Sequence, residues 1–158
     1  MGSSVAVRAV SHIAVGVRDM DASLRFYRDL LGLDVTADLM EEFTEGSEAR
    51  PVKRRAVYLR WTTGSHASFV VLDQQLTDAD HGQPPRLFQN GVHHFAFWVD
   101  DIAATVGGMR AAGVEVQYDL TDGDGADTKG YGEPPGGRIL TAFVRDPDGQ
   151  WVQLDQRA

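Results

Sequence analysis

Apolar residues alternate with polar or small ones in two stretches of the chain that lie 82 positions apart. The first stretch reads HIAVGV from His12, and the second reads HFAFWV from His94. A period of two predicts a β-strand in each. An aspartate follows each stretch, Asp19 or Asp101, and offers the N-cap of a helix. The pattern therefore predicts a strand that leads into a helix, written twice along the chain.

Each predicted helix carries apolar residues at the spacing that forms one stripe. In the first copy these are Met20, Leu24, Tyr27 and Leu31, and in the second Ile102, Val106 and Met109. A glycine, Gly32 or Gly113, then stands where the end of a helix favours left-handed backbone. We expect each helix to bury this stripe and to stop at that glycine.

Three more strands are expected after each helix. In the first copy they lie near residues 34–43, 55–62 and 67–73, and in the second near 114–119, 138–144 and 150–155. The stretch 119–137 is rich in Gly, Pro and Asp, which predicts a long loop of the kind that acts as a lid. The sequence is thus interpreted as α+β, with two βαβββ modules at about 9–76 and 91–156 in a single domain over 1–158.

Strand alternation also predicts which side chains share a face. If the odd-numbered apolar residues of each first strand face the helix, then His12 and His94 face the other way. Trp98 follows the same parity, and on the last strand Trp151 and Gln153 share this face because Val152 and Leu154 face the helix. A histidine on a strand is otherwise structural or merely exposed, but equivalent positions in two copies favour a shared site. Imidazole and amide oxygen suit Fe(II), Mn(II), Co(II), Ni(II) or Zn(II), so we predict a metal site.

Composition narrows the classes of function. The 158 residues fit one domain, and the formal net charge of -8 with no basic cluster argues against a nucleic-acid partner. The absence of cysteine excludes thiolate metal sites and a cysteine nucleophile. No apolar run reaches 18 residues, so no membrane span is predicted. The first residues show no export signal, and the cytoplasm is the expected compartment.

Three stretches carry a family resemblance: SHIAVGVRDMDASLRFYRDLLGL, GVHHFAFWVDDI and FVRDPDGQWVQL. With them the chain resembles the vicinal-oxygen-chelate superfamily, which includes glyoxalase I, bleomycin-resistance proteins and extradiol dioxygenases. The resemblance implies a cupped, barrel-like mixed sheet with the helices outside. It also implies a divalent metal that is chelated by two oxygens of a small molecule, and a homodimer.

The resemblance also implies site residues. His12 and His94 match the ligands that open each module, and Gln153 stands where a glutamate is usual. The fourth position falls at about Val70, which cannot bind metal. Three ligands resemble extradiol dioxygenases, which favours Fe(II) or Mn(II). Gln153 is interpreted as a weak ligand, the alternative being that the metal site has lapsed and the cup only binds a small molecule.

A second likeness involves the stretch RAVYLRWTTGSHASFVVLDQ, which resembles a strand pair of extradiol dioxygenases. It makes His66 the candidate acid or base, although Ala67 stands where that family has a second histidine. The expected lining of the substrate pocket comprises Trp98, Trp151, Arg60, Val70, Phe143 and Tyr131.

The first hypothesis is therefore a metal-dependent dioxygenase that acts on an aromatic diol or a related oxyanion. One alternative is a glyoxalase-like lyase or isomerase that acts through an enediolate. The lack of a second carboxylate ligand and of an evident glutamate in the pocket counts against it. The other alternative is a non-catalytic protein that sequesters an aromatic compound or drug.

Overall fold

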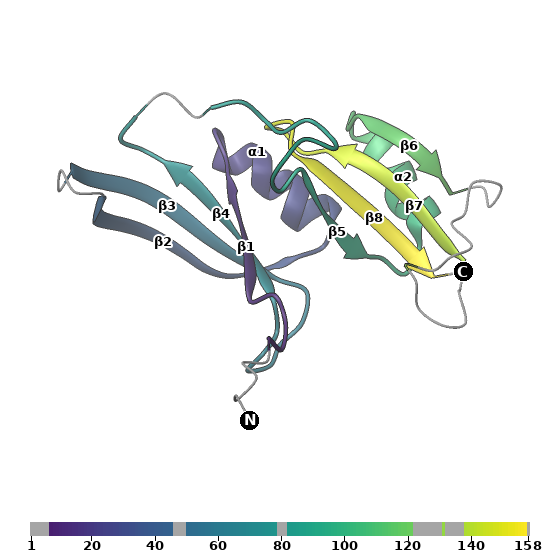
Figure 1. The fold of residues 1–158 in the computed structure, drawn as a ribbon, viewed down its shortest axis with the longest axis horizontal. Helices are drawn as coiled ribbons and strands as arrows, with labels where there is room; N and C mark the ends of the chain where they lie inside the picture. Colours follow the sequence, from purple (N-terminus) through teal and green to yellow (C-terminus); the bar gives the residue numbers. More distant parts are fainter. Residues whose placement is uncertain (1–6, 46–49, 79–81, 122–130, 132–137, 158) are drawn as a thin grey trace. The chain divides into compact units, whose positions relative to one another are not determined.

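The computed structural model describes residues 7–45, 50–78, 82–121, 131 and 138–157. The chain divides into two compact units, Met1–His81 and Gly82–Ala158. Each unit holds one module of the predicted order, a strand, a helix and three strands (Figure 1). The predicted α+β fold of two βαβββ modules is confirmed. The single domain, in which both modules line one cup, stays a prediction.

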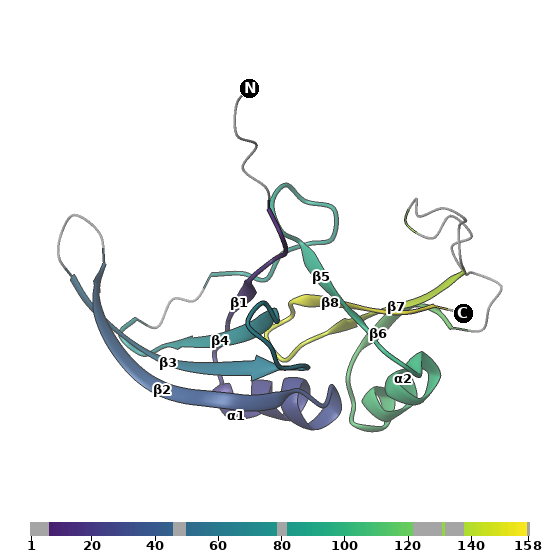
Figure 2. The same ribbon diagram turned by 90° about the horizontal axis from the view of Figure 1, so that it is seen from below.

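The first module consists of β1 (His12–Gly16), α1 (Met20–Leu24), η1 (Arg25–Leu30), β2 (Asp34–Glu45), β3 (Arg50–Arg60) and β4 (Phe69–Gln75). Its sheet has the order β1-β4-β3-β2. The first and last strands, β1 and β4, run parallel, and the other neighbours are antiparallel. The helix covers one face of this sheet, and the other face has no helix (Figure 2).

The first helix begins where the sequence predicts and then widens. The carboxylate of Asp19 accepts hydrogen bonds from the N–H groups of Asp21 and Ala22, both at 3.0 Å. From Arg25 onward the helix is a π-helix, η1. This wider turn buries Phe26, whereas Leu31, predicted from an α-helical period, is only half-buried.

The second module repeats this arrangement. It consists of β5 (His94–Trp98), α2 (Ile102–Ala111), β6 (Val116–Leu120), β7 (Ile139–Arg145) and β8 (Trp151–Arg157). The sheet order is β5-β8-β7-β6, with β5 and β8 parallel. The carboxylate of Asp101 caps α2 by accepting from the N–H of Ala104 at 2.8 Å. Gly32 and Gly113 have φ of 75° and 80°, so both predicted helix ends are confirmed.

The predicted strands are all present, but the β2–β3 hairpin is longer than the sequence pattern suggested. Strand β3 starts at Arg50 rather than near residue 55. Oppositely charged side chains pair across this hairpin: Arg54 with Glu41 at 2.7 Å and Arg55 with Asp38 at 2.8 Å. Such cross-strand ion pairs stabilise the part of the hairpin in which apolar residues no longer alternate with polar ones.

Alternation along the paired strands separates a core face from an open face, as predicted. On the helix side, Val15, Leu72 and Leu154 are at most 5% exposed. His12 and His94 alternate with the buried residues of β1 and β5. Each histidine therefore lies on the face of its own sheet that points away from the helix. Within the described part of the chain, no helix is long and apolar enough to cross a membrane.

Leu72 and Leu154 occupy equivalent core positions of the two modules, and both are 0% exposed. Leu72→Ala and Leu154→Ala should each lower the free energy of unfolding by roughly 2–5 kcal/mol, because each leaves a cavity in a packed core. Leu39→Ala, at a side chain that is 45% exposed, is the control and should change it by less than about 1 kcal/mol. Urea unfolding followed by circular dichroism measures all three. Equal losses at Leu39 and Leu154 would contradict this assignment of the core.

Candidate functional site

The parallel pairing of β5 and β8 places the predicted ligands of the second module on one face. In the register of this pair, His94 lies beside Trp151, Ala96 beside Gln153, and Trp98 beside Asp155. Because side chains alternate along a strand, all of these project from the face without the helix. Gln153 is two residues after Trp151, the partner of His94, so His94 and Gln153 are diagonal neighbours on the same face of adjacent strands.

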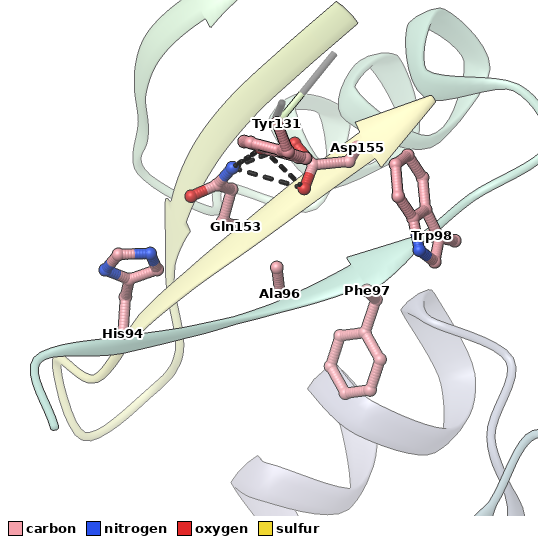
Figure 3. Close-up of a pocket in the computed structure, with 7 residues that line it drawn as sticks. All are labelled: His94, Ala96, Phe97, Trp98, Tyr131, Gln153 and Asp155. Carbon is pink, nitrogen blue, oxygen red and sulfur yellow. Dashed lines mark hydrogen bonds between the residues drawn. The ribbon is translucent and has the colours of Figure 1, made fainter. Parts of the chain in front are cut away.

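An open hollow of about 270 Å³ lies over this face. Its lining includes His94, Ala96, Trp98, Tyr131, Gln153 and Asp155 (Figure 3). Phe97 also borders the hollow, but its ring points to the other side of β5. The small side chain of Ala96 leaves space between His94 and Trp98, so a ligand can reach the amide of Gln153.

The amide of Gln153 is oriented by its hydrogen bonds. Its Nε2 donates to Asp155 Oδ1 at 2.9 Å, to Asp155 Oδ2 at 3.2 Å and to the hydroxyl of Tyr131 at 2.6 Å. Only the amide nitrogen can donate to a carboxylate, so Oε1 must point the other way. In Figure 3 this oxygen lies on the side of His94. The amide therefore presents a carbonyl oxygen beside an imidazole.

Asp155 is the residue of this hollow that the sequence interpretation missed. Its side chain is buried, at 3% exposure, and its Oδ2 also accepts a hydrogen bond from Tyr131 at 3.0 Å. The signal was present in the sequence, because Asp155 is two positions after Gln153 on one strand and must share its face. The hollow thus contains a carboxylate that had been thought absent.

His94 is half-buried and contacts the ring of His93, with the two Nδ1 atoms 2.8 Å apart. Burial lowers the pKa of the His94 imidazole below its ordinary value of 6.5, and His93 lowers it further. The charge of Asp155 acts in the opposite direction. The lowered pKa favours the neutral form of His94, which is the state in which an imidazole binds a metal.

The predicted aromatic lining separates into three roles. Trp98 borders the hollow and is 54% exposed, with the guanidinium of Arg157 4.5 Å from the centre of its ring. Trp151 is buried at 3% exposure beneath the guanidinium of Arg145, so it belongs to the packed sheet and not to the described lining. Phe143 meets the His94 ring edge-on at 5.3 Å and supports its orientation.

Tyr131 is the described part of the long loop that the sequence predicted as a lid. Its ring is 54% exposed and lies 6.4 Å from that of Trp98. The rest of the predicted loop from residue 122 to 137 lies outside the described residues. Tyr131 reaches the hollow through its hydroxyl, as expected for a pocket residue.

The first module places His12 on the equivalent face of its own sheet, where its ring stacks on Phe69 at 5.0 Å. The register corrects the fourth ligand position. Val70 pairs with Ile13 on the helix side and is fully buried, whereas Val71 pairs with Ala14 on the face of His12. The equivalent of Gln153 is therefore Val71. The conclusion that this position cannot bind metal is unchanged.

His66 and Arg60 border a second hollow, of about 240 Å³, within the first module. The guanidinium of Arg60 lies 4.4 Å from the centre of the Phe69 ring, and its Nη1 donates to the carbonyl of Ala67 at 3.0 Å. His66 is exposed in the turn that precedes β4. These contacts give Arg60 a fixed place near an open space, while the acid or base role of His66 stays a prediction.

The donors of the second module fit a divalent cation. A neutral imidazole and an amide oxygen lie near one another, and among the described residues Gln153 Oε1 accepts no hydrogen bond that would compete. Asp155 adds a negative charge behind the amide. No group of three His, Asp or Glu side chains arranged for a metal occurs in the part of the chain described here. Among its described residues, the second module therefore offers two neighbouring donor groups, and their role as metal ligands stays a prediction.

Comparison with known proteins identifies the family. Residues 9–154 match the model of the Glyoxalase/Bleomycin resistance protein/Dioxygenase superfamily. The chain belongs to this superfamily. The resemblance inferred from the sequence is thereby confirmed, and with it a family whose members commonly use divalent metals on small molecules.

Relatives that are named for an activity include lactoylglutathione lyases. The chain is 29% identical to a lactoylglutathione lyase of Haemophilus influenzae over 147 residues, which is 92% of this chain and 90% of that protein. It is 28% identical to a probable lactoylglutathione lyase of Vibrio cholerae, covering 93% and 89% of the two chains. These similarities span both modules.

Solved structures show the same fold. A glyoxalase I of Leishmania major matches with a TM-score of 0.61 at 22% identity, covering 94% of this chain and 86% of that one. A glyoxalase family protein from Bacillus cereus matches with a TM-score of 0.67 at 17% identity, covering 99% and 98%. At these identities the structures support the architecture alone.

The dioxygenase hypothesis was wrong. It rested on a count of three ligands and on one short stretch around His66. The similarity to lactoylglutathione lyases covers more than nine-tenths of the chain. The lack of a carboxylate in the pocket had counted against a lyase, but Asp155 lines the hollow of the second module. An oxidoreductase activity on an aromatic diol is therefore withdrawn.

The lowered pKa of His94 gives a testable pH dependence in metal-free protein. Between the folded-state pKa and about 6.5 the unfolded chain binds more protons, so this residue makes the free energy of unfolding rise with pH across that window. His94→Gln should abolish that contribution.

Asp155→Asn should lower the His94 pKa further, and His93→Gln should raise it. NMR titration of the imidazole ring protons checks both shifts, and an unmoved His94 pKa in both variants would contradict the described contacts.

Proposed function

We propose that this chain is a metal-dependent lyase or isomerase of the glyoxalase type. Its substrate would be the adduct of a thiol with a 2-oxoaldehyde, and its product a 2-hydroxyacyl thioester. The similarity to lactoylglutathione lyases supports this class, because lactoylglutathione is such a thioester. The observation that carries the proposal is the hollow of the second module, where imidazole, amide oxygen and carboxylate share one face.

In this proposal His94 and Gln153 of the second module are protein ligands of a divalent cation, and the part of His12 as a further ligand stays a prediction. Such a cation, when bound, would polarise the two adjacent oxygens of the substrate. Imidazole and amide oxygen are compatible with Mn(II), Fe(II), Co(II), Ni(II) and Zn(II). Because His94 and Gln153 are neutral, they add no negative charge against an oxyanion in the hollow.

The reaction moves one proton between neighbouring carbons. The proton leaves the carbon that bears sulfur, an enediolate forms, and a proton returns to the adjacent carbon; the hydroxyl proton of the adduct passes to the neighbouring oxygen, which becomes the hydroxyl of the product. Substrate and product are isomers, so no oxidant or reductant is consumed. Because His94 is assigned to the cation, Asp155 is the described lining residue whose side chain could accept this proton. Tyr131 borders the same space and lies within hydrogen-bond reach of Asp155.

A second candidate is a protein that binds a small molecule without transforming it. Two observations favour it: Val71 and Gln153 are both neutral at equivalent positions, and the exposed ring of Trp98 offers a flat wall. A neutral ligand set weakens the hold on a cation, since one unit-charge pair near 4 Å is worth roughly 4 kcal/mol at an effective dielectric of 20. The same assay separates the two candidates.

Metal-loaded protein should convert a mixture of glutathione and methylglyoxal to the thioester, followed by ultraviolet absorbance. His94→Ala should reduce kcat/KM by about a hundredfold or more, because several kcal/mol of charge stabilisation are lost with the cation.

Asp119→Asn is the matched control, since it removes a carboxylate of the same module that pairs with Arg110 at 2.6 Å and does not line the hollow. It should retain the activity of the unmodified protein. Absence of turnover with every metal of the panel, together with tight binding of the adduct, would overturn the proposal in favour of a binding protein.

A further inference from the structure

Asp155 carries a buried negative charge that no described cationic side chain neutralises. The residue is 3% exposed, and among the described residues its hydrogen-bond donors are the neutral side chains of Gln153 and Tyr131. Burying a carboxylate is unfavourable unless another charge compensates it. In the described part of the second module, neither a lysine nor an arginine forms an ion pair with Asp155. The position therefore favours a cation that is not a side chain.

The first module provides an internal comparison. Asp73 occupies the equivalent register position, beside Gly16 on the face of His12. Its carboxylate is neutralised by Arg54, whose Nη1 lies 2.9 Å from Oδ1. An aspartate in the same place of the repeat thus has a cationic partner in the first module, whereas the described partners of its counterpart in the second module are neutral.

The geometry of Gln153 shows where the charge of Asp155 acts. Both carboxylate oxygens accept from Gln153 Nε2, so the amide stands between Asp155 and the space beside His94 (Figure 3). A carboxylate that accepts from an amide N–H polarises the amide and increases the electron density on its oxygen. Asp155 therefore both orients Gln153 Oε1 and makes it a better ligand.

We propose that Asp155 is a positioning residue that restores to the metal site the negative charge that Gln153 lacks. The carboxylate expected at residue 153 is displaced by two positions along β8 and acts on the cation through the amide. This inference rests on the proposed function only in requiring a divalent cation at His94 and Gln153. Under this inference Gln153 is a functional ligand and does not indicate that the metal site has been lost.

The test is the affinity of the metal-free full chain for Co(II), measured by calorimetry and by the visible absorption of the ion. Asp155→Asn should weaken Co(II) binding by roughly 10- to 100-fold, the usual range for loss of a residue that supports a metal ligand. Asp119→Asn, which removes the same charge away from the hollow, should bind Co(II) as the unmodified protein does.

A charge exchange distinguishes this role from a merely structural one. The double variant Gln153→Glu with Asp155→Asn returns the carboxylate to residue 153, and it should bind Co(II) within about tenfold of the unmodified protein. Gln153→Glu alone should gain less than about tenfold, because its new carboxylate repels Asp155. If Asp155 had no influence on the metal site, Gln153→Glu alone should raise the affinity for Co(II) by about a thousandfold.

The outcomes are decisive in both directions. Unchanged Co(II) affinity in Asp155→Asn, a gain above tenfold in Gln153→Glu alone, or no Co(II) binding by the unmodified chain at millimolar concentration would each overturn the inference. If Asp155→Asn does not fold by circular dichroism, Gln153→Glu alone decides.

The inference and the proposed function fail separately. Lost turnover at unchanged affinity in Asp155→Asn would reject this role and leave the lyase standing. The predicted affinities without any thioester formation would reject the lyase and leave this role standing.

Discussion

The parallel pairing of the first and last strands of each module is the constraint on which the candidate site depends. It places β8 beside β5 so that Gln153 lies two residues beyond the partner of His94, on the same face of the sheet. A shift of one residue would move every side chain of β8 to the other face and place Val152 and Leu154 in the hollow. Those two residues are fully buried on the helix side, so core packing holds the register that the chemistry requires.

The two modules share this frame but differ in charge. At the ligand position of the closing strand, one has Val71 and the other Gln153, and neither side chain is charged. Two positions further along, both have aspartate, and among the described residues Asp73 is paired with an arginine while Asp155 is not. In the first module, the position of Val71 is apolar and the charge of Asp73 is neutralised by Arg54, so this face needs no added cation. The second module keeps a buried acid whose described partners are neutral, which is a reason to assign it the larger part in binding a cation.

Much of the architecture could be predicted from the sequence, because it is written as a repeat with a period of two in the strands and aspartate caps before the helices. What could not be predicted has physical causes. The π-helix at Arg25–Leu30 leaves no mark in an apolar pattern that fits an α-helix equally well. The choice between Val70 and Val71 depends on strand pairing, which a single strand does not reveal. The length of the β2–β3 hairpin depends on ion pairs between strands.

Asp155 was missed for a different reason, and its case shows how a site can change without losing its chemistry. The family resemblance points to residue 153 as the ligand position, and the side chain at that position is neutral. Parity alone includes residue 155, since side chains two apart on a strand lie on one face. A carboxylate at either position faces the same hollow, directly at 153 or through the amide at 155. A charge can therefore move by one pleat along a strand while the site keeps its face, its imidazole and its overall charge.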